Sequence, residues 1–183
     1  EGKVEKVKRK EIPPTIIKKT PVTKEETLAS PVGFKKGTFY LTPQIGINSW
    51  TIPFGVNGEY AMTPNLGVGA TSMIWLWSGE FWSESVIALT GEVNYHFTKL
   101  KVDKLDLYVG GGIGFTIYSW KWKSSYGEWF GEGGTGSSGL SIQPFLGARY
   151  YFSPKFAAHL RLAGAIVGNW AGFGGTLGVS FSL

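Results

Sequence analysis

Strict alternation of apolar with polar or small residues is the feature that most constrains how this chain can fold. In the first such segment, Phe39, Leu41 and Ile45 fall on one face and Tyr40 and Thr42 on the other. Successive side chains of a strand point to opposite faces, so this period predicts β-strands and not helices. The sequence contains eight such segments. They span residues 39–48, 54–60, 66–76, 87–97, 107–118, 140–152, 156–166 and 173–183.

The residue types on the two faces indicate which solvent surrounds the strands. One face consists of Leu, Ile, Val, Phe and Ala and carries no charge, whereas the other holds Gly, Ser, Thr, Asn, Gln and the charged residues Glu59, Glu92, Arg149 and Arg161. A soluble barrel would expose many Lys and Glu on its outside, yet these strands contain almost no Lys. If the apolar face meets lipid and the polar face fills a narrow interior, both observations are explained.

The sequence therefore predicts an all-β fold with two parts. Residues 37–183 are expected to form an eight-stranded antiparallel up-and-down transmembrane β-barrel, and residues 1–36 an extended N-terminal tail. No segment has the roughly 18 to 20 consecutive apolar residues that a transmembrane helix needs.

Aromatic residues are sorted by strand end, as in the aromatic girdles of membrane barrels. All eight Trp residues, Trp129 among them, fall at the ends of the first, third, fifth and seventh segments or in the connections beyond. The opposite ends carry a cluster of Tyr and Phe. We predict an outer-rim aromatic belt made of Trp50, Trp75, Trp77, Trp82, Trp120, Trp122 and Trp170.

The lengths of the connections predict the orientation. The connections after the second, fourth and sixth segments are short or modest, whereas residues 77–85 and 122–139 form longer ones. Short turns belong on the periplasmic side of an outer-membrane barrel, so both termini are expected in the periplasm of a Gram-negative-type bacterium. No signal-peptide pattern opens the sequence, and we expect the chain to be a mature or trimmed product.

The N-terminal tail carries all of the net charge. Residues 1–36 hold ten Lys and Arg, five Glu and four Pro, so the net charge of +5 lies there and residues 37–183 are balanced. The barrel thus lacks the basic surface that nucleic-acid binding requires. Three interpretations of the tail remain open: a disordered linker, an arm that becomes ordered on a partner, or a basic cluster attracted to anionic lipid. The predicted tail contacts are Lys8, Arg9, Lys10, Ile16 and Ile17.

The inward-facing charges and histidines are the candidate site. Eight strands leave an interior just wide enough for side chains to fill. Glu59, Glu92, Arg149 and Arg161 sum to zero charge, which favours a buried ion-pair network that closes the lumen over a gated polar pathway. His96 and His159 face the same interior. The inward glycines at 110–114 are expected to make room for the ring of a neighbouring Tyr.

The sequence offers few residues for catalysis. It contains no Cys and two His, so thiol nucleophiles and a His- or Cys-based metal site are not expected, and neither is a cofactor. No exposed Ser can be placed beside His96 to act as a nucleophile. We therefore expect a protein that is not an enzyme, with a lipid-modifying enzyme as the disfavoured alternative.

Three stretches resemble the small eight-stranded outer-membrane barrels, the OmpA/OmpX-like and opacity-protein-like group. They read LYVGGGIGF at 107–115, FLGARYYFSPKFAAHLRL at 145–162 and LGVSFSL at 177–183. The resemblance implies an outer-membrane barrel in contact with lipid and lipopolysaccharide.

Three functional hypotheses follow. The favoured one is a structural or accessory subunit of a larger outer-membrane assembly, which binds other outer-membrane or periplasmic proteins through its tail. The others are a free-standing barrel that binds a surface with its third loop, and a narrow, low-conductance channel.

Overall fold

The computed structural model describes residues 33–48, 52–100, 102–123, 133–137, 139–165 and 172–183. Residues 1–30 and 31–183 form two separate units, and the described residues all belong to the second. The predicted tail contacts and Trp50, Trp129 and Trp170 lie outside the described residues.

Nine strands and one helical turn make up the regular structure of the described residues. In chain order they are β1 Phe39–Asn48, β2 Phe54–Ala61, β3 Leu66–Ser78, β4 Trp82–His96, η1 Thr98–Leu100, β5 Leu105–Trp122, β6 Gly134–Ser137, β7 Ser141–Ser153, β8 Phe156–Ala165 and β9 Gly172–Ser182. The described part of the chain has no helix that is both long and apolar enough to cross a membrane.

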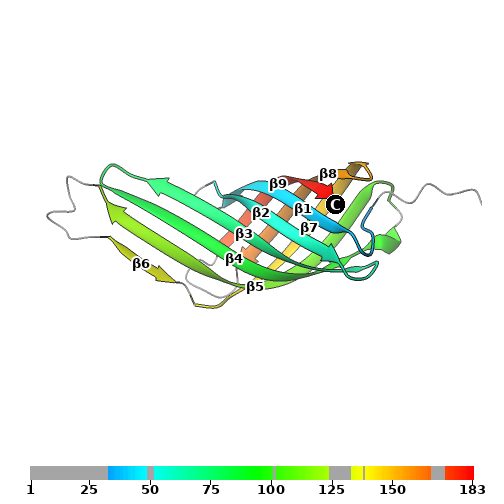
Figure 1. Ribbon diagram of the computed structural model, residues 1–183, viewed down its shortest axis with the longest axis horizontal. Helices are drawn as coiled ribbons and strands as arrows, with labels where there is room; N and C mark the ends of the chain where they lie inside the picture. Colours follow the sequence, from blue (N-terminus) through cyan, green and yellow to red (C-terminus); the bar gives the residue numbers. More distant parts are fainter. Residues whose placement is uncertain (1–32, 49–51, 101, 124–132, 138, 166–171) are drawn as a thin grey trace, which may run out of the picture. The chain divides into compact units, whose positions relative to one another are not determined.

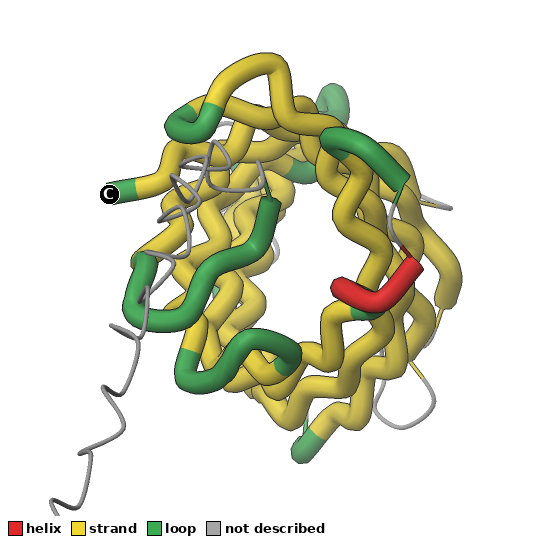
Figure 2. The backbone as a smooth tube through the Cα atoms, turned by 90° about the vertical axis from the view of Figure 1, so that its right-hand side faces the viewer, coloured by secondary structure: helices red, strands yellow, loops and turns green. Residues whose placement is uncertain are grey.

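Eight of these strands close into a barrel. Neighbours from β1 to β5 pair antiparallel, β5 pairs with β7, the pairing continues through β8 to β9, and β9 returns to β1. Figures 1 and 2 show the tilted strands and the closed ring. The start of β1 and the end of β9 lie at one end with the β2–β3, β4–β5 and β7–β8 turns, and we call it the short-turn end. The opposite end is the long-hairpin end.

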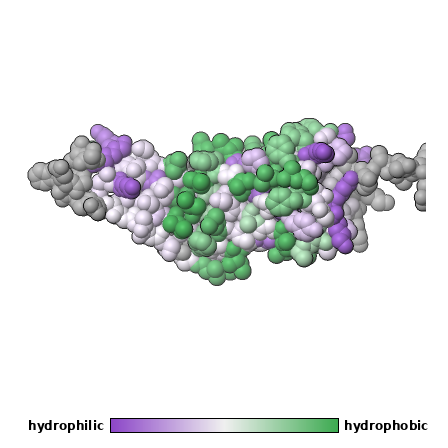
Figure 3. All heavy atoms as spheres, viewed as in Figure 1, coloured by the Kyte–Doolittle hydropathy of each residue, from purple (hydrophilic) through white to green (hydrophobic). Residues whose placement is uncertain are grey.

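The barrel is apolar outside and polar inside, as the alternation predicts. Ile113 and Leu146 are 58% and 55% exposed, whereas Arg149 is only 1% exposed. In Figure 3 hydrophobic residues form a broad band over the barrel strands, and hydrophilic residues lie beyond it at both ends. Such an exterior is favourable in lipid and costly in water, so the barrel is a membrane-spanning one. The predicted eight-stranded up-and-down transmembrane barrel is confirmed.

The short-turn end carries an outward-facing aromatic girdle. Tyr95 packs edge-on against Phe97, with ring centroids 5.4 Å apart. A second run of ring contacts passes from Tyr150 through Phe152 and Phe156 to Phe181. Aromatic rings of this kind are typical of the interface between lipid and water.

Strands β3, β4 and β5 run further than the sequence predicted. The predicted connection 77–85 is instead a tight hairpin, in which the Gly79 amide donates to the Trp82 carbonyl at 2.9 Å. Part of the predicted loop 122–139 forms β6, which pairs with β5 from Trp120 to Ile117. We call residues 75–78, 82–86 and 118–122, together with β6, the hairpin extension.

In this extension the apolar face turns inward and the polar face outward, which is why the sequence predicted most of it as connections. Ile74, Ile87 and Ile117 stand side by side and form an outward-facing apolar row. Beyond that row the inward positions are mainly aromatic. The outward positions there, apart from Leu76, are Ser78, Ser83, Ser85, Ser119 and Lys121. The outward face of the extension is therefore suited to water, which puts the lipid boundary near the isoleucine row.

An arginine on the barrel's outer face tests the lipid assignment. We expect Leu146→Arg to lower the free energy of unfolding by about 2–4 kcal/mol, the cost of a charge near the bilayer midplane. Urea unfolding in lipid vesicles measures this. Thr135→Arg on β6 is the matched control, and we expect a change within about 0.5 kcal/mol. Equal effects of the two substitutions would contradict the assignment.

Candidate functional site

Glu59 on β2 is the centre of the first buried cluster. Its carboxylate accepts hydrogen bonds from Arg149 on β7, from the Asn94 amide at 2.6 Å and from His96 Nε2 at 2.9 Å. The guanidinium of Arg149 also lies over the rings of Tyr40 and Tyr108, 4.9 Å and 5.3 Å from their centroids. Strands β2, β4 and β7 thus meet at one carboxylate, which couples their register.

His96 bridges two carboxylates. Its Nε2 faces Glu59, and its Nδ1 lies 2.9 Å and 3.0 Å from the two carboxylate oxygens of Asp106 on β5. A carboxylate only accepts hydrogen bonds, so the imidazolium form of His96 donates to both neighbours. Glu92 lies four residues before His96 on the same face of β4, but it belongs to a different cluster.

Asp106 is the buried charge that sequence reasoning missed. The predicted segment began at residue 107, whereas β5 begins at Leu105, so Asp106 fell one residue outside the prediction. Asp106 shares its strand face with the inward-facing Tyr108, and extending the alternation by one residue would have found it. In the barrel Asp106 stands directly opposite Arg149.

Glu92 on β4 is the centre of the second buried cluster. Arg161 on β8 donates to both of its carboxylate oxygens, at 2.7 Å and 2.8 Å, and Asn57 donates to one of them at 3.1 Å. The guanidinium of Arg161 also lies over the Phe145 ring, 3.6 Å from its centroid. A bidentate pair of this kind fixes geometry as well as charge.

A Tyr–His pair lies between the two clusters. The Tyr108 hydroxyl is hydrogen-bonded to Nε2 of His159, and the two rings stack at 5.9 Å. The Tyr108 ring fits because it lies against Gly147, where a Cβ would collide with it. The glycines at 110–114 were expected to make room for a Tyr ring, but a Cβ at Gly110 would meet the ring of Phe145 instead.

Phe34 packs inside the barrel near the short-turn end, although it falls in the predicted tail. It is 8% exposed and stacks on His96 with ring centroids 3.5 Å apart and on Tyr40 at 5.4 Å. The amide of Lys35 donates to the Tyr40 hydroxyl at 2.8 Å. The residues just before β1 therefore pack into the barrel, and nothing in the alternation signals this, because they precede the first strand.

The structure places all six predicted interior residues on the inner face and buries them. They are Glu59, Glu92, His96, Arg149, His159 and Arg161. With Asp106 included, the two clusters bring together three carboxyl groups, two guanidinium groups and the imidazole of His96. Among the described residues, no group of three or more His, Asp and Glu is arranged to hold a metal ion.

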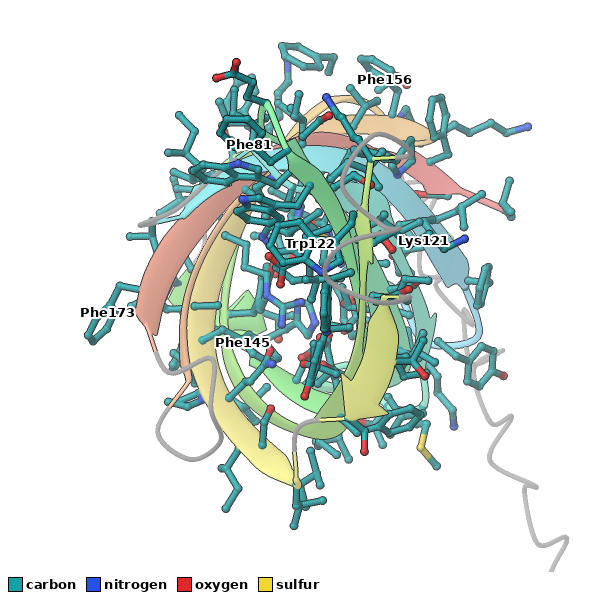
Figure 4. The ribbon with its side chains drawn as sticks, turned by 90° about the vertical axis from the view of Figure 1, so that its left-hand side faces the viewer. Phe81, Lys121, Trp122, Phe145, Phe156 and Phe173 are labelled. Carbon is teal, nitrogen blue, oxygen red and sulfur yellow. The ribbon has the colours of Figure 1, made fainter. Side chains whose placement is uncertain are left out.

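The five described residues of the predicted aromatic belt do not face lipid. Trp75, Trp77, Trp82, Trp120 and Trp122 occupy the predicted strand ends, but the register puts them on the face that continues the inside of the barrel. In Figure 4 Trp122 lies over the middle of the ring and its neighbour Lys121 points away from it. The lipid-facing interpretation of these five residues is therefore corrected.

The barrel is similar to several solved outer-membrane barrels. It matches the Pseudomonas aeruginosa protein OprG with a TM-score of 0.63 and 11% identity, over 83% of this chain and 98% of that one. The chain has the fold of the small outer-membrane barrels. The N-terminal barrel of OprF from the same organism matches with a TM-score of 0.60 and 16% identity, over 81% of this chain and 98% of that one.

A third similar structure is Ail, the attachment invasion locus protein of Yersinia pestis. It has a TM-score of 0.52 and 13% identity, over 81% of this chain and 100% of that one. Another structure of Ail is a complex with the heparin analogue sucrose octasulfate. No protein-family model matches the sequence, and no curated protein matches it.

Removing one member of the Glu59 cluster tests its role in stability. We expect Arg149→Met to lower the free energy of unfolding by about 3–5 kcal/mol, because it leaves buried carboxylates without their cation. Urea unfolding in lipid vesicles measures the change.

The double variant Glu59→Gln, Arg149→Met should cost less than the sum of the two single changes, because it removes both charges. Lys155→Met removes an exposed cation and serves as the control. Additive effects of the two cluster substitutions would show that Glu59 and Arg149 act independently.

Proposed function

We propose that this chain is a closed, non-conducting anchor in the outer membrane, which works by presenting binding surfaces. The observation that supports the proposal is the burial of charged and aromatic side chains inside the barrel. Two ion-pair clusters, the Tyr108–His159 pair and Phe34 occupy successive levels of the lumen. Arg149 and Arg161 each bind partners on other strands, so neither side chain can swing aside without breaking buried interactions.

The apolar exterior and the fold of the barrel support a proposal for the membrane in which it lies. The apolar band supports contact with outer-membrane lipid and lipopolysaccharide, and the fold supports a location in the outer membrane of a Gram-negative-type bacterium. Both termini are proposed to be periplasmic, because the strands that continue beyond the lipid boundary as the hairpin extension do so at the opposite end. The long-hairpin end would then face outward.

A non-enzymatic role is supported by the state of the two histidines. Each is buried, His96 between two carboxylates and His159 against Tyr108. A general base must reach a substrate proton, and neither ring has an open approach.

Ion conductance tests the closed lumen. We expect the full-length chain in planar bilayers to give no stable conductance steps, because buried ion pairs and rings occupy the interior. The double variant Phe145→Ala, Arg161→Ala removes the guanidinium that binds Glu92 and the ring against which that guanidinium lies, and we expect it to give brief openings. Steady conductance of the unaltered protein would contradict the proposal and favour the channel hypothesis.

The accessory-subunit hypothesis concerns the N-terminal segment. We propose that residues 1–30 contact another outer-membrane or periplasmic protein, with the basic Lys8, Arg9 and Lys10 and the apolar Ile16 and Ile17 as contacts. The net charge of +5 that residues 1–36 carry supports the idea.

Deletion of residues 1–30 tests this hypothesis and spares Phe34, which packs in the barrel. We expect a protein that co-purifies with the full chain from native membranes in mild detergent to be lost on deletion. Retention of heat-modifiable migration on a gel would show that the shortened barrel still folds. A companion that persists after deletion, or no companion with the full chain, would contradict the hypothesis.

A further inference from the structure

The inward face of the hairpin extension forms a pocket lined by aromatic rings. Its volume is about 340 Å³, and it is lined by Trp82, Glu84, Tyr118, Trp120 and Trp122. This lies at the lower end of the range for small-molecule sites. All five residues come from β4 and β5, two strands that pair without a register shift, so the pocket has a regular β-sheet as its floor.

The rings of the pocket are arranged as walls. Trp120 and Trp122 pack edge to face, with centroids 5.9 Å apart and planes at 87°. Trp82 is nearly parallel to Trp77 of β3, at 6.2 Å. Opposite Trp120 on β6 stands Gly134, and a Cβ there would come within 3.0 Å of the Trp120 indole nitrogen. The absence of a side chain at this position leaves room for that ring.

Glu84 is the one charged residue that lines the pocket. It stands directly opposite Trp77 on one side and Trp120 on the other. No ion pair joins Glu84 to a cation within the described residues. Lys121 follows Trp120 on β5, opposite Ser83, but alternation puts its side chain on the other face of that strand. The pocket therefore combines aromatic walls with one negative charge that no cation of the described residues pairs with.

We propose that this pocket binds a methylated ammonium group, such as the trimethylammonium of a choline headgroup. Such a cation is attracted to the faces of Trp and Tyr and to the carboxylate of Glu84. It has no N–H groups, so it leaves no unsatisfied donor when the rings surround it. A polyanion such as sucrose octasulfate would be repelled by Glu84. This inference rests on the binding role proposed above and names its ligand.

Titration of the full-length chain with choline tests the proposal. The protein is folded in micelles of a polyoxyethylene detergent, which has neither a choline nor a sugar headgroup, and Trp fluorescence reports binding. We expect saturable binding of choline and none of dimethylbutanol, in which carbon replaces the nitrogen. Equal binding of the two compounds, or binding of neither, would overturn the proposal.

Two variants and a control locate the site. We expect Glu84→Gln to weaken choline binding about tenfold and Trp120→Leu to weaken it by a similar factor. Glu80→Gln, in the turn just outside the pocket, removes a carboxylate without changing the lining and should bind as the unaltered chain does. Heat-modifiable migration checks that each variant is folded.

The outcomes separate this inference from the proposed anchor. Unchanged binding by Glu84→Gln would overturn the charge-based recognition, and tighter binding of sucrose octasulfate than of choline would assign the pocket to polyanions. Neither result would alter the conductance of the barrel, which tests the closed lumen by itself.

Discussion

The narrow interior of an eight-stranded barrel is the constraint on which the rest of this structure depends. Lipid surrounds the strands, and the lumen has room for side chains but little for bulk water. Each inward-facing charge must therefore find its partners on other strands. Glu59, Arg149 and Asp106 come from three different strands, and His96 joins them from a fourth. The polar clusters and the register of the barrel thus depend on each other.

The sequence predicted the fold and the inward face well, because both depend on alternation alone. Which residues pair inside was not predictable, since pairing depends on strand tilt and register. His96 contacts Glu59 and Asp106, not the Glu92 that lies on its own strand. Asp106 was missed because the apolar pattern of β5 was taken to begin after it. Phe34 was missed because it lies before any strand.

The hairpin extension was not predicted for a different reason. Alternation identifies a strand by one apolar face, but it does not say which face is inside. Within the lipid, the apolar residues of these strands point outward. Beyond the lipid boundary, their aromatic residues point inward and polar residues such as Ser83 and Ser85 point outward, so this stretch resembles a loop in the sequence. The inversion marks the level at which the solvent changes. It also gathers Trp residues around Glu84, where a lipid-facing belt would have spread them around the barrel.

The packing of Phe34 gives the N-terminal segment a mechanical connection to the lumen. The chain runs directly from Gly33 into a ring that stacks on His96. Tension applied to the preceding residues would therefore load the His96–Glu59–Asp106 contacts before it reached the hydrogen bonds between β1 and its neighbours. A barrel anchored in this way resists pulling with its charged interior as well as with its strands.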